Sequence, residues 1–101
     1  MTTATDTTYN GWPNYATWRV NIEVFDGLDV REYFGGEVPE AYDAAQWARE
    51  HAQEIVYNSL DDTGGGVAEG WALAFLQEVE WHAIARHLVE YAADCAQSEA
   101  A

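Results

Sequence analysis

The side chains of this chain that could do chemistry are mostly carboxylates. Eighteen Asp and Glu stand against four Lys and Arg in 101 residues. Two carboxylates can act as general acid and base when burial beside a cleft separates their pKa values. Acidic residues are so abundant here that no single pair is diagnostic, and most of them must lie on the surface. We therefore expect a protein that is not an enzyme, with no catalytic residues.

The three histidines and the single cysteine are poorly placed for a metal site or a nucleophile. Glu78 and His82 are four residues apart, but a helix break is expected between them. His82 and His87 point to different faces of a helix, so they cannot bind one ion together. Cys95 falls on an apolar stripe with no basic residue nearby, which is typical of a small core residue. We expect no metal site and no cofactor.

Of the properties of this sequence, the formal charge of −14 says most about which molecules the protein can bind. A surface this negative repels phosphates and anionic lipids, so direct binding to nucleic acid or to a membrane is not expected. It attracts basic surfaces, above all the nucleic-acid-binding groove of another protein. The charge also has two possible origins that involve no such groove. One is an acidic surface without a special partner, and the other is adaptation to high salt, which also produces acid-rich chains without Lys.

The length and the ends of the chain predict a small, soluble protein of the cytoplasm. Residues 1–101 are enough for one domain with a modest core, and the Thr-rich segment 1–9 is expected to be a flexible tail. The N-terminus lacks the basic and apolar regions of a signal peptide, and no segment approaches the roughly 20 apolar residues of a membrane span. One cysteine cannot form an internal disulfide, which fits a reducing compartment.

The spacing of apolar residues predicts an all-α fold, an irregular bundle of four to five helices. The expected helices cover residues 15–25, 28–34, 39–59, 67–78 and 81–96. A strand over 19–25 is an alternative for the first, because Val20 and Val24 favour strands. Its inward face as a helix would hold Tyr15, Trp18, Ile22 and Phe25. In the fourth helix Trp71 is expected to face the interior, and Gly70 to mark a close helix contact.

The helix over 39–59 carries alanines on one face and acidic residues on roughly the opposite face. Carboxylates three or four residues apart on a helix lie about 5–6 Å apart along its axis, which is of the order of the phosphate spacing along DNA. Trp47 lies among them, either as a packing residue or as an exposed anchor. We predict a partner-binding surface that consists of Glu37, Glu40, Asp43, Trp47, Glu50, Glu54, Asp61 and Asp62. The last two belong to a Gly-rich loop that lacks the Lys-Ser/Thr of a phosphate cradle.

Residues 10–18 read Asn-Gly-Trp-Pro-Asn-Tyr-Ala-Thr-Trp, a segment rich in turn-forming and aromatic residues. Gly11 permits an unusual backbone conformation and Pro13 excludes a helix or strand interior. Asn14 can then cap a helix that begins at Tyr15. We predict that this segment is a structural clasp whose tryptophans fill the core that the later helices build.

Residues 9–18 resemble the opening of a family of small proteins encoded by phages and plasmids, which begins Asn-Gly-aromatic-x-Asn-Tyr-x-Thr-Trp. Residues 79–87 resemble the Val-Asp-Trp-x-x-Ile-Ala-x-His segment of the same family, with Glu80 where Asp is usual. The two matches cover about a fifth of the chain. The resemblance implies a small helical protein of a mobile element and transfers no catalytic residue. By class, such acidic proteins resemble DNA-mimicking anti-CRISPR and anti-restriction inhibitors.

Charge and resemblance together predict an inhibitor of a nucleic-acid-binding defence complex of the host. It would act by acidic DNA mimicry, with the basic surface of that complex as its partner. Two alternatives remain: a non-enzymatic interaction or regulatory module of a phage or plasmid that uses exposed aromatic residues, and an acidic protein adapted to a halophile.

Overall fold

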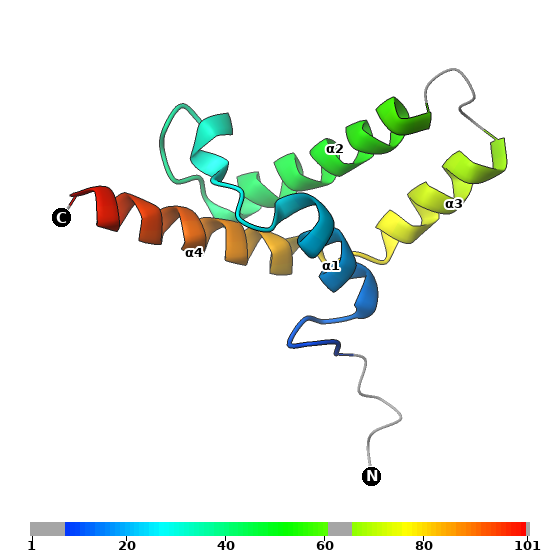
Figure 1. Cartoon of the computed structure of the whole chain (residues 1–101), viewed down its shortest axis with the longest axis horizontal. Helices are drawn as coiled ribbons and strands as arrows, with labels where there is room; N and C mark the ends of the chain where they lie inside the picture. Colours follow the sequence, from blue (N-terminus) through cyan, green and yellow to red (C-terminus); the bar gives the residue numbers. More distant parts are fainter. Residues whose placement is uncertain (1–7, 61–65, 101) are drawn as a thin grey trace, which may run out of the picture.

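A computed structural model describes residues 8–60 and 66–100 (Figure 1). Within those residues the fold is all-α, which confirms the predicted class, and the only extended pairing there is one bridge between Tyr9 and Trp12. The helices are α1 (Tyr15–Val20), the π-helical turn η2 (Asn21–Phe25), the 3-10 helix η3 (Val30–Tyr33), α2 (Ala41–Leu60), α3 (Gly66–Gln77) and α4 (Trp81–Ala100).

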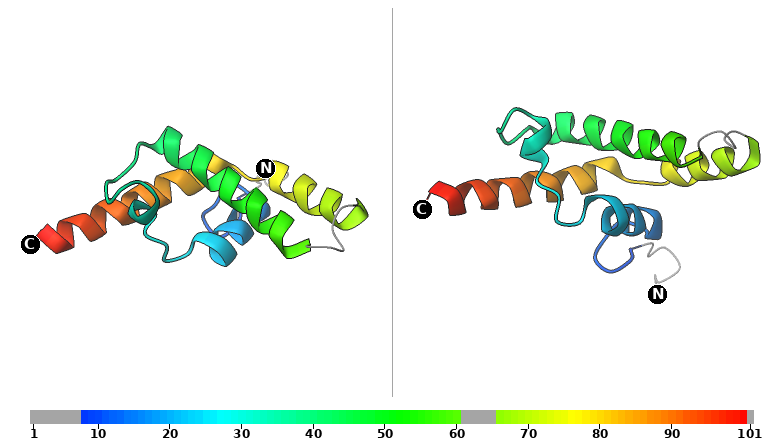
Figure 2. Two further views of the ribbon diagram at one scale, coloured as in Figure 1. Left: turned by 90° about the horizontal axis from the view of Figure 1, so that it is seen from above. Right: turned by 45° about the horizontal axis from the view of Figure 1, so that its top comes forward.

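The two long helices, α2 and α4, pack across each other and form the centre of the fold (Figures 1 and 2). Small side chains line the buried face of α2, so the two helix axes can approach closely. The buried residues are Ala44, Ala45, Ala48 and Ala52 on α2, and Ala83, Ile84, Ala85, Leu88 and Ala92 on α4. Both helices lie where the sequence predicts them, although α4 continues to Ala100, beyond the expected end at residue 96.

The first helical segment buries a different face from the predicted one. Tyr15 and Ile22 are exposed, whereas Ala16, Thr17 and Val20 are buried. After Val20 the α-helix becomes the π-helical turn η2, which inserts one extra residue into the helical repeat. The buried side chains therefore follow the spacing of Ala16, Val20 and Phe25, and the alternative of a strand over 19–25 is wrong.

The predicted clasp joins the start of α1 to the junction between α3 and α4. Asn14 Oδ1 accepts hydrogen bonds from the Thr17 N–H (2.8 Å) and from Thr17 Oγ1 (2.7 Å). Asn14 Nδ2 donates to the Glu78 carbonyl at 2.8 Å, and the Glu80 N–H donates to Thr17 Oγ1 at 2.9 Å. The turn between α3 and α4 is thus held by two side chains from the far end of the sequence.

The aromatic rings of this segment have two different surroundings. Trp12 packs against the core, and its ring centroid lies 4.1 Å from that of His87 on α4. Trp18 instead lies beside Tyr9 and Tyr15, two residues that are exposed. The prediction that tryptophans of the clasp fill the core therefore holds for Trp12, while Trp18 belongs to a surface group of rings.

Arg31 on η3 forms an ion pair with Glu99 in the C-terminal part of α4. Its guanidinium lies 2.7 Å from Asp29 Oδ2 and 2.8 Å from Glu99 Oε2. The hydrogen bonds from Arg31 lower the pKa of Asp29 and of Glu99 below their ordinary values of 3.8 and 4.5. A lowered pKa means that each carboxylate stabilises the fold above its ordinary value, and that this contribution disappears as the pH falls through the lower, folded-state pKa.

We expect Glu99→Gln to lower the melting temperature at pH 7. The difference from wild type should shrink as the pH falls below the ordinary pKa of 4.5 and vanish below the lowered pKa of Glu99 in the folded state. Melting curves of both proteins across this range measure the difference. The variant must be compared with wild type at each pH, because protonating the 18 Asp and Glu also reduces the charge repulsion within the whole chain and so changes the melting temperature of both proteins. Asp94→Asn is the control: it removes the same charge from an exposed site of α4 that makes none of the ion pairs in the described residues. A Glu99→Gln difference that is absent at pH 7, or constant with pH, contradicts the expectation.

Candidate functional site

The acidic residues predicted to bind a partner lie along α2 and in the segment that leads into it. Glu37 belongs to that segment, and the Glu40 carbonyl accepts a hydrogen bond from Ala44 in the first turn of α2 (2.9 Å). Asp43, Glu50 and Glu54 lie on the helix itself. All five are exposed. Asp61 and Asp62, the other two predicted members, lie outside the described residues. We call the five described carboxylates the α2 acidic face.

The α2 acidic face is not neutralised by the cations of the described chain. The ion pairs found among residues 8–60 and 66–100 join Arg19 to Glu23, and Arg31 to Asp29 and Glu99. None of them includes a carboxylate of the α2 acidic face. Arg49 is the one Lys or Arg within α2, and it contributes to a hollow on the side of α3. The negative potential of the face is therefore available to another molecule.

Helix geometry fixes the spacing of these charges. Asp43 and Glu50 are separated by about 10 Å along the axis, and Glu50 and Glu54 by about 6 Å. The alanines of α2 bury the opposite side of the helix against α4, so the charged side has little freedom to rotate or bend. Such a face presents its charges in nearly fixed positions, and binding through it costs little conformational entropy.

Trp47 lies beside these carboxylates but belongs to an aromatic cluster under η2 and η3. It is partly buried and packs against the core. Its ring centroid lies 4.7 Å from that of His51, with the rings nearly parallel, and 4.6 Å from that of Tyr33. Phe25 and Phe34 contact it edge-on. Trp47 thus holds the η2–η3 segment on α2 and keeps the helix in place behind its charged side.

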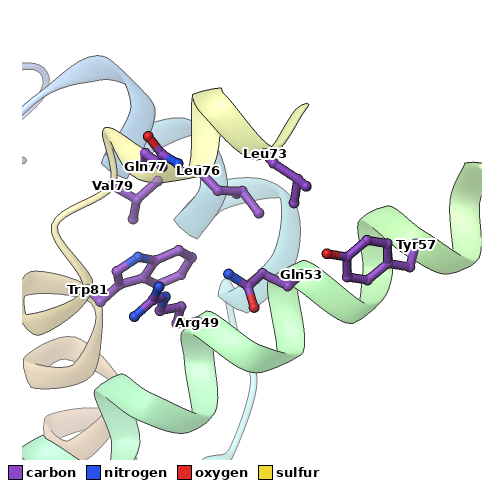
Figure 3. A pocket seen from close by; sticks show the side chains of 8 residues that line it. All are labelled: Arg49, Gln53, Tyr57, Leu73, Leu76, Gln77, Val79 and Trp81. Carbon is purple, nitrogen blue, oxygen red and sulfur yellow. The ribbon is translucent and has the colours of Figure 1, made fainter. Parts of the chain in front are cut away.

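The hollow between α2 and α3 has a volume of about 380 Å³. Figure 3 shows the side chains that point into it from both helices and from the start of α4. They are Arg49, Gln53, Tyr57, Leu73, Leu76, Gln77, Val79 and Trp81. None of these described side chains is a carboxylate, a histidine or a cysteine, and the Tyr57 hydroxyl is the one group among them of a kind used in acid–base or nucleophilic catalysis.

The histidines do not converge with carboxylates either. No group of three or more His, Cys, Asp or Glu that could hold a metal ion occurs among the described residues. His87 lies against the Trp12 ring, and His51 against Trp47. Both imidazoles serve as flat packing partners for an indole in this fold.

Two expectations for α3 are wrong. Trp71 is among the most exposed large hydrophobic residues described, not an interior one. A Cβ at Gly70 would meet nothing within 4 Å among the described residues, so this glycine marks no close contact with another described helix. The cause is that α3 buries only Leu76 fully and packs on the rest of the molecule through one side. Val67, Trp71 and Phe75 form a row at intervals of four residues in the sequence, but such a row is equally typical of a buried face.

Comparisons with protein-family models, with curated proteins and with solved structures find no match to this chain. In the part of the chain that the structure describes, none of the helices is long and apolar enough to cross a membrane.

Proposed function

We propose that this protein is a non-enzymatic inhibitor that presents the α2 acidic face to the basic groove of a nucleic-acid-binding defence complex, of the CRISPR or restriction class, and blocks access of DNA. The observation that carries the proposal is the set of five exposed carboxylates on and before one rigid helix, none of them in an ion pair of the described residues. The resemblance of residues 9–18 and 79–87 to proteins of mobile elements supports the choice of partner.

The physical basis of such inhibition is charge complementarity. A groove that binds a phosphate backbone holds Arg and Lys in a row and releases condensed counterions when DNA enters it. A helix with carboxylates at intervals of about 6–10 Å can satisfy several of these cations at once. The net charge of −14 accelerates the encounter through long-range attraction, and salt weakens that attraction.

The test uses the tagged chain as bait in a lysate of a host that carries such defence complexes. We expect basic nucleic-acid-binding proteins to be retained at about 50 mM salt and lost at about 500 mM, because the Debye length falls below the range of surface charge contacts. Added duplex DNA should release the same proteins, since it competes for the same groove. Mass spectrometry identifies them, and a DNA-binding assay of the purified partner then measures inhibition.

The alternatives give different results. Partners that stay bound at high salt and resist DNA indicate an interaction module that uses apolar contacts. A bait that retains no basic protein at low salt, and that unfolds there while folding at high salt, indicates adaptation to a saline cell. Either outcome overturns the proposal.

A further inference from the structure

The side of α3 that faces away from α2 carries a stripe of exposed apolar residues. Trp71 is 75% exposed, Val67 is 64% exposed and Phe75 is 37% exposed. They follow one another at intervals of four residues, so they form a continuous row on the helix. We call these three residues the α3 stripe. Val67 and Trp71 leave most of their surface in water, so burial within one chain does not account for them.

The α3 stripe continues onto the start of the chain. The Phe75 ring centroid lies 6.4 Å from that of Tyr15, and Tyr15 lies 5.1 Å from Tyr9. Both tyrosines are exposed. The result is one apolar surface that runs along α3 and across the turn before α1. Contiguous apolar surfaces of this kind mark sites of protein association.

This surface carries few charges for so acidic a protein. Helix α3 contains one acidic residue, Glu69, and no basic one. At the far end Arg19 donates a hydrogen bond to the Tyr15 hydroxyl and pairs with Glu23, so its charge is already matched. A basic partner would gain little here. A second highly acidic molecule, by contrast, can approach only where the carboxylates are absent.

Gly70 adds a second observation. It lies in the middle of α3, where glycine destabilises a helix by roughly 1 kcal/mol relative to alanine. No atom of residues 8–60 or 66–100 comes within 4 Å of the place where its Cβ would stand. Gly70 lies about 100° around the helix from Trp71, at the edge of the α3 stripe, where the missing side chain lets a second helix approach closely.

We propose that the α3 stripe is the interface of a homodimer, in which α3 of one copy packs antiparallel on α3 of a second copy. A two-fold axis across the stripe brings the same row of each copy onto itself, so the rings of Trp71 and Phe75 pack against those of the other copy. The rings of Trp71, Phe75 and Tyr15 leave on the order of 300 Å² of aromatic surface open in each copy. Stable interfaces bury about 800 Å² per partner around such a centre.

The test measures the mass in solution of the full chain by light scattering and its self-association by sedimentation equilibrium. We expect twice the 11.3 kDa of one chain at tens of micromolar. Two copies of charge −14 repel each other, so salt should strengthen the dimer. Binding to a basic groove should instead weaken with salt. The two proposals can therefore fail independently.

Trp71→Asp should weaken self-association at least ~30-fold, the usual consequence of losing a central interface tryptophan. Tyr42→Asp is the matched control: Tyr42 is 63% exposed on α2, and the substitution adds the same charge outside the α3 stripe. Its dimer should persist. A wild-type chain that is monomeric in high salt at all concentrations overturns the proposal, and so does a dimer that Trp71→Asp leaves intact.

If Trp71→Asp does not fold, a measurement on the wild-type chain tests the homodimer instead. Amide hydrogen exchange of α3 should slow as the protein concentration rises, while that of η3 stays constant, because only α3 becomes covered. Exchange of α3 that does not depend on concentration would contradict the homodimer.

Discussion

Thr17→Val is expected to lower the free energy of unfolding by about 2 kcal/mol. Valine has nearly the shape of threonine, and position 17 is fully buried, so the substitution leaves the packing intact and removes only the hydroxyl. That hydroxyl donates to Asn14 Oδ1 and accepts from the Glu80 N–H. Without it the Glu80 amide loses its acceptor at the start of α4. Urea unfolding followed by circular dichroism measures the change.

Whether Thr17→Val lowers or raises the free energy of unfolding shows whether Thr17 acts through its hydrogen bonds or only by filling space in the core. If position 17 only filled space, valine would be as good as threonine or better, because a methyl group is cheaper to bury than a hydroxyl. Thr17→Ser provides the control: it keeps both hydrogen bonds and loses one methyl group, at a cost of about 1 kcal/mol. A serine variant that is less stable than the valine variant contradicts the role assigned to the hydroxyl.

Asn14→Asp distinguishes the two roles of Asn14, which caps α1 through Oδ1 and donates to the Glu78 carbonyl through Nδ2. Aspartate caps a helix as well as asparagine does, so the start of α1 should survive. The carboxylate cannot donate, however, and it would face the Glu78 carbonyl, which now accepts from Asn14 Nδ2 at 2.8 Å. We expect Asn14→Asp to destabilise the protein in spite of its capping ability, by roughly 1–3 kcal/mol. The same urea unfolding measures the loss, and an Asp variant as stable as wild type would contradict the bridging role of Asn14.

The sequence predicts those parts of the fold that local patterns control. Helix α2 follows Pro39 and the glycines at 35 and 36, whose positive φ angles end the preceding segment. Its alanines repeat with the helical period, and so do the apolar residues of α4. The exposure of Glu40, Asp43, Glu50 and Glu54 follows from the same period, because the face opposite a buried stripe must lie in water.

What the sequence does not reveal depends on contacts between distant residues. The bonds from Asn14 to Glu78 and from Glu80 to Thr17 join residues 64 and 63 positions apart, and no local pattern identifies such partners. The π-helical turn η2 shifts the buried face of the first helix by one residue. Nothing in the composition of Asn21–Phe25 distinguishes a π-helical turn from an ordinary α-helical one. Helix α3 has apolar residues on most of its circumference, so periodicity does not distinguish its covered side from the side on which Trp71 lies exposed.

Reversing charge on the α2 acidic face should abolish binding to the basic partner that the low-salt capture recovers. In Glu50→Lys/Glu54→Lys, two carboxylates about 6 Å apart on the axis become ammonium groups. Each then repels the cation that it would otherwise pair with. We expect at least a ~30-fold loss of affinity, or about 2 kcal/mol, with a smaller dependence on salt. Titration at two salt concentrations measures both quantities.

The control is a double variant with the same net charge, in which the two reversed carboxylates lie on a different helix. Glu90→Lys/Asp94→Lys also reverses two exposed carboxylates four residues apart on a long helix, here α4. Both double variants change the charge of the chain from −14 to −10, because each substitution of Lys for an acid adds two units. If binding depends on a groove that accepts the α2 acidic face, only the first variant loses it. An equal loss in both would mean that the partner responds to total charge, and the DNA-like arrangement on α2 would then have no part in recognition.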